Sequence, residues 1–486
     1  MEKVIVYGAG IWGKETVKVL KSFGIIPYCI LDKDANLENR DIDGIHIYSL
    51  ENFSDTILSE AILLIAIRQK DRVVKDIENV ICKEKIWILD YLYRIICLKH
   101  NTNSIASNER ISKLSPTEGI CLFIDQNIAR YDMNAGHRSS LAYLKVLQTK
   151  YENIVYMIND LSPLDFKYVN TYLDMGIHIL IDFKNRCENV KLNFEFVEVN
   201  ADKIKYVFIN RPNIANIYVD FIKEKTRAKI VVYGHDLHFL RLYRQYEVTN
   251  DKEALKESDM YKQIEMNLPY KVDLVGYPSN IEVEMLSELV SSDNIKYFPL
   301  WFYEDIDFPK INTNPENSIL FVGGFNHSPN HDGIVWFVKK VLPHLRAKGI
   351  DVDIYIVGSN PTKDIIQLQG NNVHVTGYVS DEELKRLYNM CKMAILPLRY
   401  GAGMKGKLLE ALCYGKAVIS TSVGIEGLIG VEKFVYVADS EIEFSKAIHK
   451  IMHLSNEEYS ILCSQAQNYI RNNFSKEIIV DTLELT

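Results

Sequence analysis

Short apolar runs alternate with helical patterns along most of the chain. This alternation is typical of βαβ units and parallel sheets. In a first block, the apolar runs predict strands at Val4–Tyr7, Tyr28–Leu31, Ile62–Ile67 and Ile86–Leu89. A second block starts at Ile120 and predicts strands near Ile154, Ile177, Val207, Ile230 and Tyr297. A third predicts them at Ile319–Val322, Ile354–Val357, Val373–Val375, Ala394–Leu396 and Val418–Ser420.

Two polar stretches separate these blocks. Residues 99–108 lack apolar periodicity, and residues 305–317 contain Pro309 and Pro315, so both are interpreted as connecting segments. We therefore expect an α/β protein with a small Rossmann-like domain at 1–98, a linker at 99–117, a second domain at 118–304 and a third at 305–486. The C-terminal helix is expected to cross back.

Composition limits the classes of function. A length of 486 residues predicts about three domains. The 64 acidic and 56 basic residues give a net charge of -8, which argues against a nucleic-acid partner. The first residues do not fit a signal peptide, and the apolar run 61–67 is too short to span a bilayer. Eight scattered cysteines predict reduced thiols, and we expect a cytoplasmic protein.

A glycine-rich loop follows the first predicted strand. Gly8, Gly10 and Gly13 form a Gly-x-Gly-x-x-Gly pattern before a helix predicted at 12–23, and Asp32 ends the next strand. Such a loop lets a pyrophosphate approach a helix N-terminus, and the carboxylate lies where a ribose would bind. These four residues form a candidate second nucleotide site. A nucleotide-binding shape retained as a structural module is an equal alternative.

The third block contains two further glycine loops at strand ends. Gly323 and Gly324 precede Ser328 and Pro329, which we expect to be the N-cap and first position of a helix. Residues 401–407 place Lys405 and Lys407 at the start of another helix. Two ammonium groups at a helix N-terminus repel each other, and an anion bound between them offsets this repulsion. The pair therefore favours a diphosphate site over a merely solvated helix start. Glu410, one turn later, is on the same face and could bind ribose hydroxyls.

Taken in order, these motifs resemble a known family. The C-terminal donor domain of family 4 (group 1) glycosyltransferases is similar to the segments 321–324, 329–330, 355–358, 376–378, 401–411 and 424–427, and the second block adds 132–138, 211–212 and 234–241. The resemblance covers about residues 118 to 475. It implies a GT-B architecture, two Rossmann-like domains facing across a cleft, here preceded by a third, small Rossmann-like domain. It also implies a bacterial enzyme that moves a sugar from a nucleotide-diphosphate sugar to a glycan or lipid-linked acceptor in surface polysaccharide biosynthesis.

The resemblance implies retention of anomeric configuration, no required metal or cofactor, and peripheral work at the inner face of the membrane. It assigns catalysis to His235, Lys407 and Glu410, and the acceptor side to Gly136, Arg138 and Asp236. Donor binding falls to Gly323, Gly324, Asn326, Asn330, Gly377, Tyr378, Ala402, Gly403, Met404, Lys405, Lys407 and Glu410. One departure is Ala402, which stands where family members carry a glutamate eight residues before the one matching Glu410.

Two other classes of function stay open. An NAD-dependent sugar-nucleotide oxidoreductase or epimerase would use the loop at 8–13, although the first block has no Tyr-x-x-x-Lys pair. A catalytically silent binding protein of GT-B shape would explain Ala402. The spacings of His235 with His238 and of His327 with His331 suggest metal ligands, but no third ligand accompanies either pair, so we expect no metal.

Overall fold

The computed structural model describes residues 3–22, 24–54, 56–57, 61–66, 86–87, 105–106, 119–132, 135–160, 165–180, 189–300, 308–474, 480 and 483. The chain divides into two compact units, with Met1–Arg130, Tyr151–Val207 and Phe221–Ala228 in the first and Tyr131–Lys150, Phe208–Asp220 and Lys229–Thr486 in the second. The expected domain boundaries at 98, 117 and 304 lie outside the described residues and stay predictions, as does the crossing back of the C-terminal segment.

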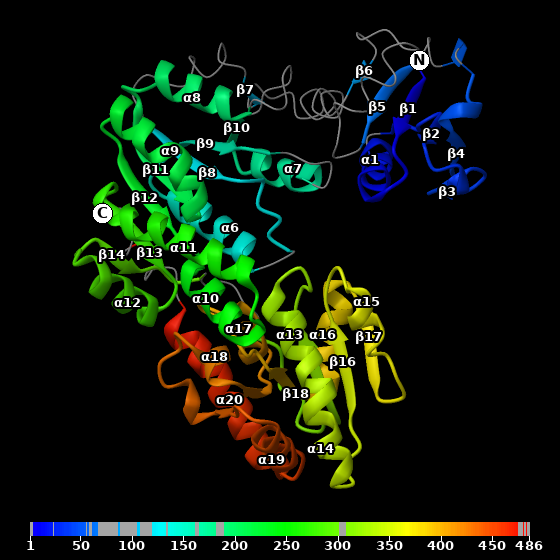
Figure 1. Ribbon diagram of the computed structural model, residues 1–486, viewed down its shortest axis with the longest axis vertical. Helices are drawn as coiled ribbons and strands as arrows, with labels where there is room; N and C mark the ends of the chain where they lie inside the picture. The colour runs from blue at the N-terminus through cyan, green and yellow to red at the C-terminus, as the bar shows by residue number, and fades with distance from the viewer. Residues whose placement is uncertain are drawn as a thin grey trace. The chain divides into compact units, whose positions relative to one another are not determined.

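A small mixed sheet opens the chain, coloured blue in Figure 1, with strand order β3-β4-β2-β1-β5-β6. Helix α1 (Ile11–Ser22) follows β1 and buries Val17 and Leu20. Short 3-10 helices η1 (Ala35–Leu37) and η2 (Leu50–Asn52) follow β2 and β4. The strands are β1 (Val4–Tyr7), β2 (Cys29–Asp32), β3 (Asp41–Ile42), β4 (Ile45–Ser49), β5 (Ile62–Ile65) and β6 (Ile86–Trp87).

A hairpin makes this sheet mixed. The strand β3 runs antiparallel to β4, and the two are joined by Asp43 and Gly44, with φ angles of 52° and 74°. Positive φ at both central residues defines a type I′ turn, for which Asp-Gly is a preferred pair. The pattern of βαβ units and parallel strands expected along the chain does not hold at this edge. The identification of the block as a Rossmann-like domain stays a prediction.

The second sheet is parallel and has the order β14-β13-β12-β11-β8-β9-β10-β7. Its strand β7 lies inside the segment expected to be a linker and pairs with β10. The strands are β7 (Ile105–Ala106), β8 (Ile120–Asp125), β9 (Asn153–Ile158), β10 (His178–Leu180), β11 (Ile204–Asn210), β12 (Lys229–Tyr233), β13 (Leu274–Tyr277) and β14 (Ile295–Tyr297). The helices are α6 (Ala135–Leu147), α7 (Phe166–Asp174), α8 (Asn189–Val199), α9 (Pro212–Lys225), α10 (His238–Thr249), α11 (Lys252–Asn267), η6 (Leu268–Tyr270) and α12 (Asn280–Val290).

The third sheet is also parallel, with the order β17-β16-β15-β18-β19-β20. Its strands are β15 (Glu316–Val322), β16 (Asp353–Val357), β17 (Val373–Gly377), β18 (Cys391–Leu396), β19 (Ala417–Ser420) and β20 (Val435–Val437). The helices are α13 (Ser328–Trp336), the π-helical η7 (Phe337–Val341), α14 (Leu342–Ala347), α15 (Lys363–Ile366), α16 (Asp381–Met390), α17 (Gly406–Cys413), α18 (Ser422–Ile425), η8 (Val431–Lys433), α19 (Glu441–Met452) and α20 (Asn456–Asn473).

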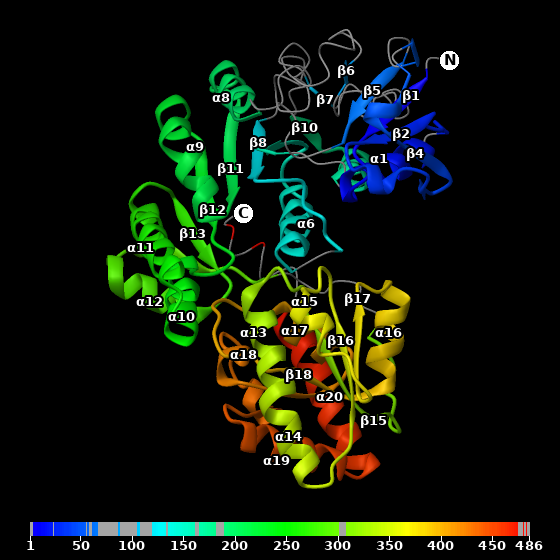
Figure 2. The same cartoon turned by 45° about the vertical axis from the view of Figure 1, so that its right-hand side comes forward.

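Helices cover both faces of this third sheet (Figures 1 and 2). One apolar core joins the sheet to α13, η7, α14 and α19, and a second joins it to α16, α17 and the far end of α20. Five cysteines of the described part, Cys29, Cys121, Cys391, Cys413 and Cys463, are buried free thiols. Because the strands are parallel, the loops that leave their carboxyl ends gather at one edge, where ligands bind in such sheets.

Candidate functional site

His235 lies in the sharp turn between β12 and α10. Its backbone is left-handed, with φ of 66°, and so is that of Arg211, with φ of 75°, just after β11. A non-glycine residue held in this region costs free energy and is over-represented at functional sites. The catalytic role of His235 stays a prediction.

The His235 imidazole is neutral. Burial, together with the nearby Arg211 charge, lowers its pKa well below the ordinary value. Its Nε2 lies 3.1 Å from Asn210 Oδ1, so the ring proton sits on Nε2 and points at that oxygen. The Nδ1 atom is buried and has no hydrogen-bond partner. It is therefore a free acceptor.

Asp236, next in the chain, is held by two cations. Its Oδ2 accepts a hydrogen bond from Arg241 Nε at 2.8 Å, and its Oδ1 lies 2.9 Å from His238 Nδ1. Burial opposes ionisation of this carboxyl, but Arg241 and His238 outweigh it and hold its pKa well below the ordinary value. Burial also opposes the charge on His238, yet Asp236 and Glu265 raise the pKa of His238 to about 10. The acceptor-side role of Asp236 stays a prediction.

The N-terminus of α10 is capped by a glutamate that the sequence analysis did not single out. Glu265, on α11, is fully buried. Its two oxygens accept hydrogen bonds from the backbone N–H groups of His238, at 2.9 Å, and Phe239, at 3.0 Å. An anion at a helix N-terminus is stabilising, so Glu265 fixes the start of the helix that follows His235 and Asp236.

Asn330 joins the two glycine loops of the third sheet. Its Nδ2 donates to the carbonyl of Gly324 at 2.8 Å, and its Oδ1 accepts a hydrogen bond from Lys407 Nζ. The expected N-cap was wrong by one residue, because His327 occupies the N-cap of α13. Ser328 instead donates its hydroxyl to Gln245 Oε1 at 3.0 Å.

The two lysines before and within α17 have different surroundings. Lys407 Nζ lies 5.6 Å from the centre of the Phe321 ring, and burial and the Lys405 charge lower the pKa of Lys407 to about 7. Lys405 is the N-cap residue and only 8% exposed. Its Nζ donates to the Gly403 carbonyl and lies 3.9 Å from Glu426 Oε2. Lys407 is thus the ammonium group that an incoming anion would stabilise most.

The loop before α17 is fixed from α10 and α12. Arg244 Nη1 donates to the Gly401 carbonyl at 2.7 Å, and the guanidinium binds Glu426 through two hydrogen bonds of 2.7 and 2.9 Å. Glu282 Oε1 accepts the Gly403 N–H at 2.8 Å. Gly403, expected to bind the donor, therefore has its N–H group already paired, while Ala402 and Met404 are buried.

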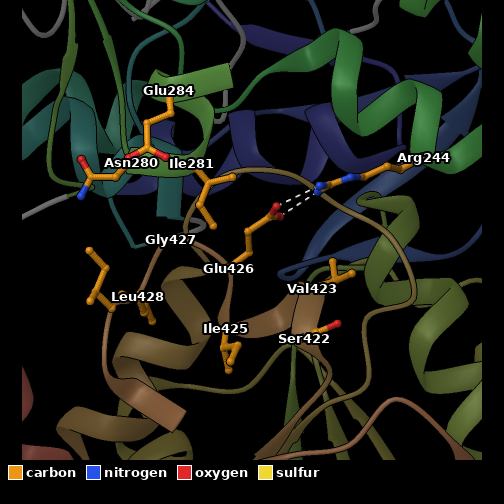
Figure 3. Close-up of a pocket in the computed structure, with 11 residues that line it drawn as sticks. Arg244, Asn280, Ile281, Glu284, Ser422, Val423, Ile425, Glu426, Gly427 and Leu428 are labelled. Carbon is orange, nitrogen blue, oxygen red and sulfur yellow. Dashed lines mark hydrogen bonds and ion pairs between the residues drawn. The ribbon is translucent and has the colours of Figure 1, made fainter. Parts of the chain in front are cut away.

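A pocket of about 540 Å³ lies beside this ion pair. Figure 3 shows the paired Arg244 and Glu426 among the lining residues, with side chains of α12 on one side and of residues 422–429 on the other. Most of its other side chains are apolar. The lining residues are Arg244, Asn280, Ile281, Glu284, Ser422, Val423, Ile425, Glu426, Gly427, Leu428 and Ile429.

Glu410 has two neighbours that bear on a ribose role. Tyr388 donates its hydroxyl to Oε2 at 3.2 Å, and Arg138 Nη1, on α6, lies 4.0 Å from Oε1. Burial raises the pKa of Glu410. Arg138, expected on the acceptor side, therefore lies next to the carboxyl expected to bind the donor. Gly136 lies two residues earlier on α6, where its carbonyl accepts a hydrogen bond from Ser140 at 3.3 Å.

The remaining expected donor residues border the same sheet edge. Gly377 ends β17 with φ of 70°, and the following Tyr378 side chain is 60% exposed. An exposed aromatic ring is a suitable stacking partner for a nucleobase. Asn326 is exposed in the loop after β15. Their donor contacts stay predictions.

The first glycine loop is closed on itself. Asp32 Oδ2 accepts the Ala9 N–H at 2.6 Å, and Oδ1 accepts the Asp34 N–H at 2.9 Å. A side chain at Gly13 would lie 1.7 Å from the Gly8 carbonyl oxygen, so glycine is required there. The residues Gly8, Gly13 and Asp32 lie together as expected, but the carboxylate holds the loop itself. A nucleotide at this loop, which includes Gly10, stays a prediction.

The described ranges contain neither a metal-binding cluster nor a membrane-spanning helix. No group of three or more histidine, cysteine, aspartate or glutamate side chains there could hold a metal ion. Within the same residues, no helix combines the length and apolarity that a membrane crossing requires.

Part of the chain matches a known protein family. Residues 316–453 match the family described as glycosyl transferases group 1. An uncharacterized 44.6 kDa protein in the cps region of Klebsiella pneumoniae is 28% identical over 179 residues, which cover 34% of this chain and 45% of that protein. The chain thus matches less than half the length of this curated relative.

Several solved structures share the fold. Sucrose-phosphate synthase from Thermosynechococcus elongatus has a TM-score of 0.56 and 15% identity, over 75% of this chain and 97% of its own. HepE from Anabaena, in complex with UDP and glucose, has a TM-score of 0.53 and 13% identity, over 75% and 98%. A glycosyltransferase from Rickettsia africae has a TM-score of 0.50 and 17% identity, over 76% and 97%.

These likenesses define an α/β protein of GT-B-like fold, with two parallel sheets and an additional small mixed sheet at the N-terminus. Within this fold, residues 316–453 match the group 1 glycosyltransferases, in agreement with the resemblance seen in the sequence.

Proposed function

We propose that the chain is a retaining, metal-independent glycosyltransferase that moves a sugar from a nucleotide-diphosphate sugar to a glycan or lipid-linked acceptor, in the biosynthesis of a surface polysaccharide. The observation that carries the proposal is the Lys407 side chain, half-buried at the N-terminus of α17 in a domain of group 1 glycosyltransferases. The cps-region relative supports a polysaccharide product.

Glycosyl transfer leaves negative charge on the departing nucleoside diphosphate. Fixed hydrogen-bond donors and cations at that position stabilise the transition state more than the ground state. Lys407 supplies this charge, with the α17 N-terminus as a second source. Lys405 contributes less directly, because Glu426 and the Gly403 carbonyl already bind it. Gly323, Gly324 and Asn330 shape the loop opposite.

His235 and Glu410 act on the two sugars of the donor. The neutral His235 ring offers Nδ1 as an acceptor for a hydroxyl of the transferred sugar. Glu410, oriented by Tyr388, accepts hydrogen bonds from the ribose. Arg138 lies close enough to Glu410 to contact the same nucleotide or its acceptor.

The test is release of nucleoside diphosphate. The full chain is incubated with UDP-, GDP- and dTDP-sugars, with and without EDTA, and the anomeric configuration of any product is read by NMR. Lys407→Ala is expected to lower turnover about a hundredfold, the usual loss for one preorganised charge-stabilising group. Lys340→Ala, an exposed lysine on η7, is the matched control.

The outcome separates the competing functions. Nicotinamide reduction that depends on a sugar nucleotide would favour the oxidoreductase that uses residues 8–13. Nucleotide binding without turnover would favour the silent binding protein. Normal turnover by Lys407→Ala would refute the assignment of the diphosphate site.

A further inference from the structure

The Glu282 carboxyl group lies between the two loops that carry the candidate site. Its Oε1 accepts two backbone hydrogen bonds of 2.8 Å, one from Leu237 and one from Gly403. Leu237 directly follows His235 and Asp236, and Gly403 precedes Lys405 by two residues. Both donors lie more than 40 residues from Glu282 in the chain, at separations of 45 and 121. One oxygen atom thus joins the histidine turn to the lysine loop.

The two loops approach too closely to hold a side chain between them. At Gly403, where φ is 68°, an added Cβ would lie 2.9 Å from Asp236 Cβ and 3.0 Å from the His235 carbonyl oxygen. The contact between the turn and the loop is therefore direct. Glu282 lies beside this contact and satisfies an N–H group on each side of it.

Burying a carboxyl group at this position is unfavourable unless its oxygen accepts hydrogen bonds. Glu282 is 0% exposed, and its second oxygen, Oε2, has no hydrogen-bond partner. Burial and the Asp236 charge raise the pKa of Glu282 to about 8. Buried polar groups are normally paired, and the two N–H groups that Oε1 binds, together with the nearby Lys405 charge, offset the burial of this carboxyl group. Arg244 holds the same loop at Gly401, but it does not bind the histidine turn in any contact of the described residues.

We propose that Glu282 is a positioning residue of the transferase, which sets the lysine loop at 401–405 against the histidine turn at 235–237 for catalysis. The inference rests on the proposed function and extends it to a residue on α12, outside both motif-bearing loops. Glu282 acts through Gly403 and Leu237.

The test compares three variants at Glu282 with one at Glu284. Glu282→Met keeps the length of the side chain but removes the acceptor, whereas Glu282→Gln keeps an acceptor oxygen. Should Glu282→Met fail to fold, Glu282→Asp, one methylene shorter, cannot reach both N–H groups and takes its place. Glu284→Gln, exposed on the same helix, is the control. Far-UV circular dichroism and thermal unfolding establish that each variant is folded.

The first measurement is the kinetics of nucleoside diphosphate release. Misplacing a catalytic loop by about 1 Å can cost a hundredfold in rate. We expect Glu282→Met to lower kcat about 10- to 100-fold with KM changed less than threefold, and Glu282→Gln to stay within about threefold of the parent in both. Parental kcat in Glu282→Met would overturn the proposal, as would a Gln variant no better than Met.

The second measurement does not depend on activity. Hydrogen exchange, read by mass spectrometry on peptides spanning 235–238 and 401–405, reports the Leu237 and Gly403 amides directly. We expect faster exchange in both peptides for Glu282→Met and parental exchange for Glu282→Gln and Glu284→Gln. Unchanged exchange in the Met variant would overturn the tether. If the parent chain releases no nucleoside diphosphate but the exchange result holds, the proposed function fails and the positioning of the two loops stands.

Discussion

Replacing Lys407 by methionine is expected to stabilise the donor-free protein while removing its affinity for nucleoside diphosphates. Lys407 is half-buried, and its charge is opposed by burial and by Lys405. Methionine has a similar length and no charge, so it fills the same space without the desolvation cost. Stability gained at the expense of function is typical of residues that are held ready for a ligand.

The magnitude follows from the pKa. Burial lowers the pKa of Lys407 from 10.5 to about 7, and each pKa unit corresponds to about 1.4 kcal/mol. The folded chain binds fewer protons than the unfolded chain between pH 7 and 10.5, so the cost is complete below pH 7 and disappears as the pH rises toward 10.5. Partial exposure reduces the cost at pH 6 to about 2 kcal/mol. Lys407→Met also loses the hydrogen bond to Asn330, which lowers the gain in stability by about 1 kcal/mol.

The assay is calorimetric unfolding at pH 6 and pH 9, with Lys340→Met as the control for an exposed lysine. We expect Lys407→Met to be more stable than the parent by about 1 kcal/mol at pH 6, with the advantage gone by about pH 9. Titration with UDP, GDP and dTDP completes the test. A Met variant that is less stable at pH 6, or that binds these nucleotides as the parent does, would show that Lys407 is not an ammonium group awaiting a diphosphate.

Three further predictions concern the same region. Only protonated Lys407 attracts a diphosphate, so the parent's Kd for a nucleoside diphosphate should rise up to tenfold per pH unit above pH 7. Isothermal titration should find this pH dependence much reduced in Lys407→Arg. Glu426→Gln leaves Arg244 half-buried beside a neutral partner, so thermal unfolding should show a loss of about 2 kcal/mol, and an unchanged melting temperature would argue against the ion pair. His235→Ala should lower turnover at least tenfold while calorimetry finds nucleoside diphosphate affinity unchanged, since Nδ1 is assigned to the sugar; a parallel loss of affinity would contradict that assignment.

The sequence predicted most strands because apolar runs in parallel sheets are nearly continuous. It missed β13 and β20, which the apolar pattern alone did not single out. The hairpin β3–β4 was also missed, although Asp43-Gly44 between Ile42 and Ile45 is a recognisable turn signal. The family motifs led to the correct domain, because glycines and lysines at strand ends have few structural uses.

The contacts that fix the site could not be predicted in the same way. Glu265 and Glu282 lie on helices whose sequences give no sign that these carboxyl groups are buried. Their backbone partners lie 26 to 121 residues away, and one sequence contains no information about such pairs. The N-cap of α13 is His327 and not the expected Ser328, whose hydroxyl donates to Gln245, 83 residues earlier in the chain.

The attachment of the lysine loop has a consequence for engineering. Arg244 and Glu282 bind the loop from helices that precede the family-matched segment 316–453. A chimera that exchanged only this segment between two transferases would separate the loop from both of its anchors. An exchange of donor specificity between two transferases should therefore include α10, α12 and the lysine loop together.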